Sequence, residues 1–271
     1  MIIGLDIGIS STKVVAIVNK KLNKAEVWDC GFSEEKLQEF IVSLSSVDSR
    51  IETIAVTGVG SKVIPSKLLG YPTIKVDEFD ANAAAASLVC NETRFIVVSM
   101  GTGTSFVEID NGIAKHIGGT ALGGGTILGL FKLMGLGNGW TQLRALAESG
   151  SVEKVDLTVA DVTTEPLPGL PLDTAVTNFG KADSNATPND IAMGLINMTL
   201  QNIGVMAFLA GSGRGIKTFL VIGRMTTLPH AAEIFERLNN LYGVNFILAE
   251  QPLYMTAMGA AHEGDKRKNH T

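Results

Sequence analysis

Both halves of the chain begin with the same pattern, in which two apolar segments are joined by a short turn rich in glycine and hydroxyl side chains. In the first half, the apolar run 2–5 ends at Asp6, and the stretch 7–12 separates it from a second run over residues 13–18, which is apolar after Lys13. In the second half, the apolar residues 95–99 lead into the turn 101–105 and a further apolar segment. Such segments predict pairs of β-strands joined by tight turns. Because the repeat is one of architecture and not of sequence, it predicts two similar α/β lobes with a cleft between them.

Helical patterns follow each of these strand units. Residues 80–89 are rich in alanine and predict a helix. Residues 189–210 predict a long helix that starts next to a proline. The proline-containing stretch 161–183 predicts an ordered loop, because apolar residues are interspersed in it. The sequence therefore predicts an α/β protein with mixed sheets flanked by helices, an N-terminal lobe over residues 1–92 and a C-terminal lobe over residues 93–271.

Composition excludes several classes of protein. The chain has 271 residues, of which 45% are apolar, so it can bury a sizeable core. Its net charge of −5 gives no reason to expect a nucleic-acid partner, and its two cysteines are too few for a disulfide framework or a zinc site. No apolar run reaches about 18 residues, so no membrane-spanning helix and no membrane partner are expected. The N-terminus lacks the basic flank of a signal peptide, which favours a cytoplasmic protein. The basic run at residues 265–268 is expected to be solvated.

The first turn combines an acid, a glycine, hydroxyls and a lysine. Asp6 ends an apolar strand, where a carboxylate can position Mg²⁺ through water. The backbone N–H groups of such a turn can hold a phosphate, and Lys13 can neutralise phosphate charge. A plain hairpin turn with a solvated lysine also explains these residues. The candidate nucleotide-binding residues of this turn are Asp6, Gly8, Ser10, Ser11, Thr12 and Lys13.

The second turn repeats this arrangement, and another glycine-rich segment follows it. The turn consists of Gly101, Thr102, Gly103, Thr104 and Ser105. Further along, Gly123, Gly124 and Gly125 open a predicted helix, which would leave bare backbone N–H groups at a positive helix end, an arrangement suited to nucleotide phosphates. A hairpin and a flexible loop with a helix cap are the structural alternatives. Neither segment matches the P-loop or the dinucleotide-binding fingerprint.

Three acids lie within four residues before the alanine-rich helix, at Asp77, Glu78 and Asp80. Acids are favoured in the first turn of any helix, which is one explanation of the pattern. The functional explanation is that one of them accepts a proton from a hydroxyl nucleophile as a general base. Phosphoryl transfer needs little else beyond charge neutralisation and in-line positioning.

Together these motifs resemble the type II pantothenate kinases of the eukaryotic and staphylococcal kind, which are members of the actin-like ATPase superfamily. The order and spacing of the motifs match over nearly the whole chain. The matching segments are residues 6–13, 78–81, 101–105, 118–125, 164–166, 178–180, 222–223 and 257–260. The resemblance implies an actin-like, ribonuclease H-like fold with a central nucleotide cleft. It also implies phosphorylation of pantothenate by ATP and Mg²⁺, the first step of coenzyme A biosynthesis, in a homodimer built through the second lobe.

The resemblance also implies roles by position. Glu78 corresponds to the catalytic base and Asp6 to the acid on the Mg²⁺ side, while Lys13 and the rest of the first turn correspond to the first phosphate turn. Gly223 lies where the superfamily binds adenosine. The other nucleotide-binding positions are Gly101, Thr102, Gly103, Gly123, Gly124 and Gly125. The substrate positions are Thr104, Ser105, His116, Gly118 and Gly119.

The sequence departs from the family pattern at two places. The first turn has Ile9 and Ser10 where the family usually has two glycines, and the serine keeps a hydroxyl. His116 stands where the family usually places an arginine that helps to hold the substrate. Arginine offers a permanent charge and a bidentate hydrogen-bond donor, whereas a neutral imidazole offers one N–H donor. The adjacent Lys115 would point to the opposite face of a strand. We therefore expect His116 to affect substrate affinity.

Two alternative functions remain open at this point. The activators of radical dehydratases share this type of first turn but carry an iron–sulfur cluster, and the present chain has two cysteines in all, Cys30 and Cys90. A catalytically silent or altered-substrate relative that binds a nucleotide or an acyl-coenzyme A is the other alternative. The retained Glu78 argues against the silent relative, and the lost arginine argues for it.

Overall fold

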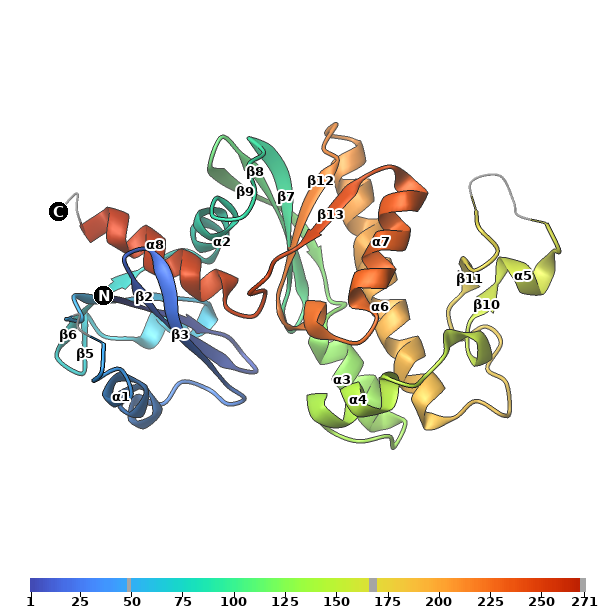
Figure 1. Cartoon of the computed structure of the whole chain (residues 1–271), viewed down its shortest axis with the longest axis horizontal. Helices are drawn as coiled ribbons and strands as arrows, with labels where there is room; N and C mark the ends of the chain where they lie inside the picture. Colours follow the sequence, from blue (N-terminus) through green and yellow to red (C-terminus); the bar gives the residue numbers. More distant parts are fainter. Residues whose placement is uncertain (48–49, 166–169, 269–271) are drawn as a thin grey trace. The chain divides into compact units, whose positions relative to one another are not determined.

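The structure is a computed structural model that describes residues 1–47, 50–165 and 170–268. It contains two compact units (Figure 1). The first consists of Met1–Ser99, Val107–Ile117 and Ala249–Thr271, and the second of Met100–Phe106 and Gly118–Leu248. Each unit is therefore discontinuous in sequence. The boundary between residues 92 and 93 stays a prediction.

The first unit contains a mixed six-stranded sheet with the order β3-β2-β1-β4-β6-β5. Its strands are β1 (Ile2–Ile7), β2 (Thr12–Val18), β3 (Lys21–Trp28), β4 (Thr53–Thr57), β5 (Lys67–Leu68) and β6 (Tyr71–Lys75). β2 pairs antiparallel with β1 and β3, whereas β4 pairs parallel with β1 and β6. The strands predicted on either side of the first turn are thus confirmed.

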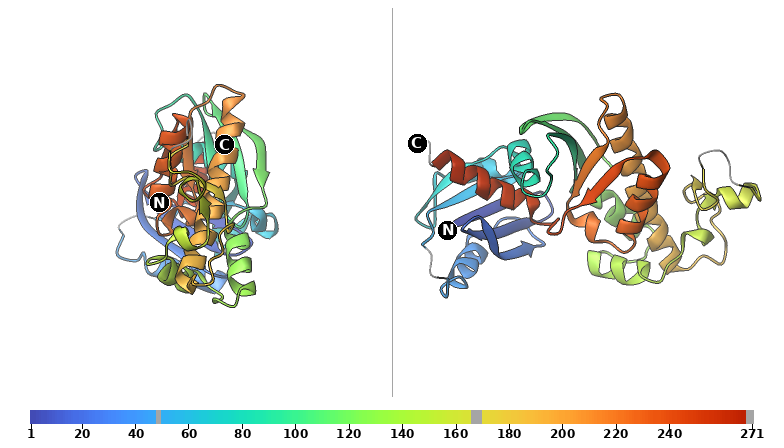
Figure 2. Two further views of the ribbon diagram at one scale, coloured as in Figure 1. Left: turned by 90° about the vertical axis from the view of Figure 1, so that its right-hand side faces the viewer. Right: turned by 45° about the horizontal axis from the view of Figure 1, so that its top comes forward.

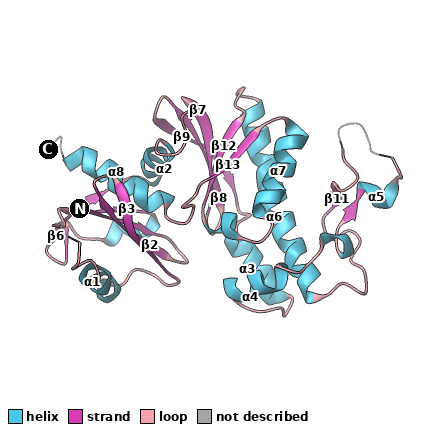
Figure 3. Ribbon diagram, viewed as in Figure 1, coloured by secondary structure: helices cyan, strands magenta, loops and turns pink. Residues whose placement is uncertain are grey.

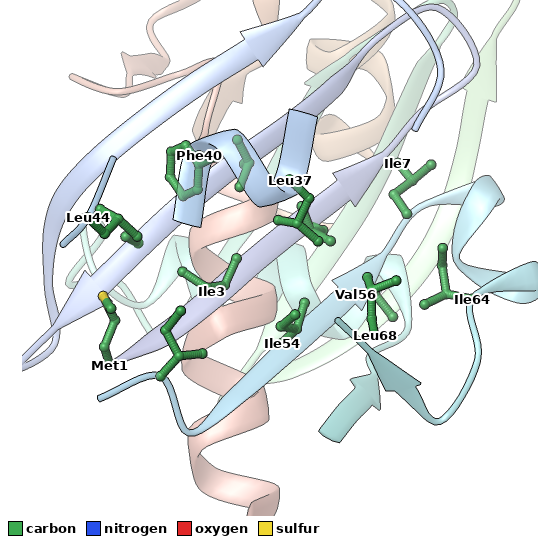
Figure 4. Close-up of a cluster of buried hydrophobic side chains, with 14 of the residues drawn as sticks. Met1, Ile3, Ile7, Leu37, Phe40, Leu44, Ile54, Val56, Ile64 and Leu68 are labelled. Atoms are coloured by element: carbon green, nitrogen blue, oxygen red, sulfur yellow. The ribbon is translucent and has the colours of Figure 1, made fainter. Parts of the chain in front are cut away.

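Helix α1 (Glu34–Val42) covers one face of this sheet. It begins at Ser33, whose hydroxyl caps the N–H of Lys36, and it buries Leu37 and Phe40. Because side chains alternate along a strand, one set of strand residues faces this helix. Figure 4 shows Leu37 and Phe40 pointing toward Ile3 and Ile54 of the sheet.

The opposite face of the sheet packs against α2 (Glu78–Ala86) and α8 (Met255–Lys268). Figure 1 and the right-hand view of Figure 2 show α8 running along the first sheet. A Cβ at Gly4 would collide with the carbonyl of Ala257, so glycine is needed for this close approach. At the end of α8, Arg267 pairs with Asp80 at 2.8 Å and Lys268 pairs with Glu52. The expectation of a solvated basic run is therefore wrong for Arg267 and Lys268.

The second sheet has the order β13-β12-β7-β8-β9. Its strands are β7 (Arg94–Met100), β8 (Thr104–Asp110), β9 (Ile113–Thr120), β12 (Thr218–Ile222) and β13 (Asn245–Leu248). The residues of β7, β8 and β9 are divided between the two units. The strand, turn and strand predicted for the start of the second half are confirmed by β7 and β8.

Most of the α-helices in the described part of the chain belong to the second unit (Figure 3). They are α3 (Gly124–Leu133), α4 (Trp140–Ala147), α5 (Val159–Val162), α6 (Pro188–Ser212) and α7 (Ala231–Tyr242), with short 3-10 turns η2 (Val152–Lys154) and η3 (Arg224–Thr227). The central α6 packs against α3, α4 and α7. It begins with Thr187 and Asp190 capping each other's backbone N–H groups, and Pro188 occupies its first turn. The long helix predicted over residues 189–210 is thus confirmed.

The predicted loop over residues 161–183 contains some regular structure. Residues 166–169 lie outside the described part of the chain. In the remainder, α5 ends at Val162, and β11 (Ala175–Thr177) pairs antiparallel with β10 (Leu157–Thr158).

Within the described ranges, α6 is the one helix that is long and apolar enough to cross a membrane by length and composition alone. However, 61% of its apolar window is buried inside the protein. Burial of this kind is typical of the central helix of a folded domain.

Candidate active site

The first turn is a two-residue hairpin between β1 and β2. The backbone N–H of Gly8 donates to the carbonyl of Ser11 at 3.1 Å, and Ile9 and Ser10 form the exposed tip. The register places Asp6 opposite Lys13, whose Nζ lies 3.1 Å from Asp6 Oδ2. The hairpin therefore joins an almost buried carboxylate to a lysine at the end of the central strand.

The side chain of Thr12 points away from this pair. Thr12 precedes Lys13 on the same strand, so the two side chains lie on opposite faces of the sheet. Thr12 is completely buried, and its hydroxyl has no hydrogen-bond partner among the described residues. The neighbouring Ser11 is also buried. A nucleotide-binding role for the Thr12 hydroxyl stays a prediction, and it would require that residue to move.

Gly58 is a residue that the functional motifs did not include. It follows β4 with φ +83°, and a Cβ there would lie 2.8 Å from Asp6 Oδ1 and 2.6 Å from the carbonyl oxygen of Ile7. Glycine therefore keeps open the space beside the carboxylate oxygen that Lys13 does not contact. The sequence signal for it is a glycine directly after an apolar strand.

Glu78 is the first residue of α2 and is half-buried. Burial raises the pKa of its carboxyl group above the ordinary value, and the negative charge of Asp6 raises it further. Lys13 opposes this increase in pKa, and Asp77 adds to it. Glu78 thus lies within electrostatic range of both Asp6 and Lys13. A carboxylate whose pKa is shifted toward neutrality is better matched to general-base catalysis near pH 7.

The structure separates the three clustered acids by their partners. Asp77 caps α2, because its Oδ1 accepts the N–H of Phe79 at 2.8 Å. Asp80 accepts a hydrogen bond from Arg267. Among the described residues, no hydrogen bond or ion pair engages the Glu78 carboxylate. The interpretation of the cluster as an acidic helix start fits Asp77, and Glu78 is left available for proton transfer.

His116 lies on β9 next to the start of α2. Its imidazole stacks on the ring of Phe79, with the centroids 4.8 Å apart and the planes at 15°. His116 and Lys115 are both exposed. The stack therefore holds His116 against the residue that follows Glu78.

In the second unit, the turn 101–105 and the glycine-rich segment 118–125 pack tightly together. Gly124 N–H donates to the carbonyl of Gly101, and Gly125 N–H to that of Thr102, both at 2.9 Å. The expectation that these N–H groups are bare is therefore wrong for Gly124 and Gly125, because they are satisfied within the protein. A Cβ at Gly123 would collide with the carbonyl of Thr102.

The remaining substrate positions also lie in this packed region. Thr104 Oγ1 donates to the carbonyl of Leu122 at 2.9 Å, and a Cβ at Gly119 would lie 2.6 Å from the carbonyl oxygen of Thr104. Ser105 and Gly118 are half-buried beside them.

Gly223 and Trp140 complete this region. Gly223 has φ +104°, and a Cβ there would collide with the carbonyl oxygen of Met100, directly before the second turn. The indole of Trp140 lies against Gly124, where a Cβ would approach Cζ2 to 2.8 Å. The guanidinium of Arg224 lies 5.6 Å from the Trp140 ring centroid. The tryptophan thus packs against the start of α3.

The predicted residues fall into two groups, one in each compact unit. The first group contains Asp6, Gly8, Ser10, Ser11, Thr12, Lys13, Glu78 and His116. The second contains Gly101, Thr102, Gly103, Thr104, Ser105, Gly118, Gly119, Gly123, Gly124, Gly125 and Gly223. In the described part of the chain, no cluster of three or more His, Cys, Asp or Glu side chains could hold a metal ion.

Comparisons with known proteins identify the family. The family model described as Fumble matches residues 80–261. A type II pantothenate kinase from Bacillus cereus is 30% identical over 230 residues, which cover 82% of each chain.

Solved structures give the fold. The activator of the 2-hydroxyisocaproyl-CoA dehydratase from Clostridium difficile with bound ADPNP matches 99% of this chain and 97% of that chain, with TM-score 0.67 and 16% identity. The ROK hexokinase from Thermus thermophilus matches 96% of each chain, with TM-score 0.56 and 14% identity. The predicted actin-like ATPase fold is thereby confirmed. On the strength of the family model and the Bacillus relative, the chain belongs to the Fumble family of type II pantothenate kinases.

Proposed function

We propose that this protein transfers the γ-phosphoryl group of ATP to the primary hydroxyl of pantothenate, which yields 4'-phosphopantothenate and ADP in the first step of coenzyme A biosynthesis. Family membership supports the reaction. The observation that carries the mechanism is the Glu78 carboxylate at the start of α2. Its pKa is raised, and the charges of Asp6 and Lys13 act on it. The comparisons give no support to a silent relative.

Glu78 is the base in this mechanism. It accepts the hydroxyl proton of the substrate as the bond from oxygen to the γ-phosphorus forms and the bond to the β-phosphate oxygen breaks. Burial keeps this carboxylate from being strongly solvated and raises its pKa toward that of a useful base. Asp6 favours proton uptake further, because its negative charge disfavours a second carboxylate nearby.

ATP and Mg²⁺ are the cofactors of this proposal. Bound Mg²⁺ would neutralise phosphate charge, and it usually keeps several waters while binding one or two carboxylates and the phosphates. The residues present fit that requirement, because Gly58 leaves space beside Asp6 Oδ1 and no all-protein cage is needed. Lys13 holds the other Asp6 oxygen and places a positive charge beside it. The glycine-rich residues of the second unit are proposed to contact the nucleotide.

His116 is proposed to contact the substrate in place of the family arginine. The substitution His116→Arg should lower the KM for pantothenate, because it restores a permanently charged, bidentate hydrogen-bond donor. An unchanged or higher KM would mean that this chain binds its substrate in a different way.

The test is ADP release from MgATP with and without pantothenate, measured for the wild type, Glu78→Gln and Asp77→Asn at pH 6 and pH 8. We expect pantothenate-dependent turnover that falls by about 10²–10⁴-fold in Glu78→Gln while ATP binding persists. Asp77→Asn is the matched control, because Asp77 caps the helix and an asparagine side chain also caps. Retained turnover in Glu78→Gln would move the base to another acid. Absence of turnover in the wild type would refute the proposed substrate.

The assembly and location of the protein are part of the same proposal. We propose a cytoplasmic homodimer without a nucleic-acid or membrane partner, as the family resemblance and the burial of α6 favour. Sedimentation equilibrium would measure the mass in solution, and a monomer at micromolar concentration would contradict the dimer.

A further inference from the structure

We propose that Phe79 determines substrate affinity by fixing the orientation of the His116 imidazole. The inference rests on the proposed function, since it concerns the residue that replaces the family arginine at the substrate position. In this proposal, Phe79 is a positioning residue: it acts through His116 and does not itself contact the reacting atoms.

The geometry is that of an aromatic stack. The centroids of Phe79 and His116 are 4.8 Å apart, and their planes differ by 15°. This separation lies within the range at which aromatic pairs attract each other. Phe79 is half-buried and His116 is exposed, so the phenyl ring provides the fixed surface on which the imidazole lies.

The phenyl ring is itself held in place by its helix. The backbone N–H of Phe79 donates to Asp77 Oδ1 at 2.8 Å, and the next residue, Asp80, is paired with Arg267. Glu78 precedes Phe79 in the same turn of α2. One turn of helix therefore fixes both the proposed base and the surface on which His116 rests.

The stack limits how the imidazole can meet a substrate. Its ring nitrogens lie in the plane of the ring and donate or accept along the ring edge. Phe79 covers one face, so rotation about the His116 side-chain bonds is restricted, and the edge is presented in one direction. A free imidazole at an exposed position would lose more rotamer freedom when it binds the substrate. Removal of the ring should therefore weaken substrate binding without affecting the chemical step.

A double-mutant cycle tests this inference. We compare Phe79→Leu, Phe79→Tyr, His116→Ala and the double variant Phe79→Leu/His116→Ala. Phe79→Leu should raise the KM for pantothenate by about threefold to tenfold, the range set by an aromatic pair, while kcat and the KM for ATP change less than about twofold. Phe79→Tyr should keep the wild-type KM, because it retains the ring. In the His116→Ala background, Phe79→Leu should add less than about twofold.

Two results would overturn the inference. One is an unchanged pantothenate KM in Phe79→Leu. The other is an equal increase in the presence and absence of His116, which would show that Phe79 acts only by supporting the fold.

Nuclear magnetic resonance of the histidine rings separates this inference from the proposed function. The chain has four histidines, so the His116 signal is assigned by its loss in His116→Ala. The ring-current shift of His116 should disappear in Phe79→Leu and persist in Phe79→Tyr. An identical shift in Phe79→Leu would refute the stack whether or not pantothenate is a substrate. If wild-type protein shows no pantothenate turnover but the shift depends on Phe79, the proposed function fails and the positioning of His116 stands.

Discussion

The substitution Gly223→Ala should lower the stability of the second unit by more than the strain of a positive φ angle alone would do. Gly223 has φ +104°, and a Cβ there would collide with the carbonyl oxygen of Met100 and lie 2.7 Å from its carbonyl carbon. Both neighbours are backbone atoms of Met100, the last residue of the central strand β7, so neither can rotate away as a side-chain atom could. The added methyl group therefore meets a steric and a conformational penalty together.

The expected loss of stability follows from these two penalties. A strained backbone conformation costs about 1–3 kcal/mol, and overpacking of a dense core costs about 1–3 kcal/mol. Together they give a loss of about 2–6 kcal/mol, a large fraction of the roughly 5–15 kcal/mol that stabilises a typical domain. Met100 directly precedes the second turn, so its displacement should also weaken nucleotide binding.

Two other glycines of the same unit provide matched controls. Gly215 has φ +67° but open space around its Cβ position, so Gly215→Ala should cost about 1–2 kcal/mol through backbone strain alone. Gly213 has φ −67° and open space, so Gly213→Ala should be neutral or stabilising by up to about 1 kcal/mol. Urea unfolding and calorimetric titration with an ATP analogue would measure both effects. Equal losses of stability in Gly223→Ala and Gly215→Ala would refute the steric argument.

Three further predictions concern ionised groups. Glu78→Gln should lower kcat yet raise the Tm at pH 8, because the raised pKa means that ionised Glu78 destabilises the fold. The difference in Tm between wild type and variant should disappear below about pH 4.5, where the carboxyl group is protonated in both the folded and the unfolded chain. Asp190→Asn should lower the free energy of unfolding by about 1.5–3 kcal/mol at pH 7, as measured by urea unfolding, because the Ser151 N–H and other donors stabilise the ionised carboxylate and lower its pKa. This loss should shrink as the pH falls through that lowered pKa. Arg267→Met should remove the ion pair with Asp80 and cost less than about 1 kcal/mol in urea unfolding, because both side chains are partly exposed to solvent.

The local features of the fold could be predicted from the sequence. Alternating apolar residues and turn-forming residues predict the β1–β2 hairpin, because both signals act between near neighbours. The long α6 is likewise encoded by its own cap at Thr187 and Asp190. In the site, the same local reasoning identifies the acidic start of α2.

The features that could not be predicted depend on residues far apart in the chain. No local pattern indicates that α8 returns to pack on β1, or that Arg267 reaches Asp80 across 187 positions of sequence. The role of Gly58 depends on the carboxylate of Asp6, which belongs to a different strand. Such pairings are visible only when the tertiary contacts are known.

Glycine-rich segments are ambiguous for the same reason. In the second unit, Gly123 and Gly223 are needed because backbone atoms pass too close for a Cβ, and the N–H groups of Gly124 and Gly125 are already bonded to the turn before them. Close backbone packing therefore explains the glycines of these motifs, and phosphate binding is not needed to account for them. The chemical signal comes instead from Glu78, because a half-buried carboxylate with a raised pKa lowers stability when it is ionised. We propose that a carboxylate held at this cost serves the reaction, and for this reason the opposite effects of Glu78→Gln on kcat and Tm are the strongest joint test of the proposed base.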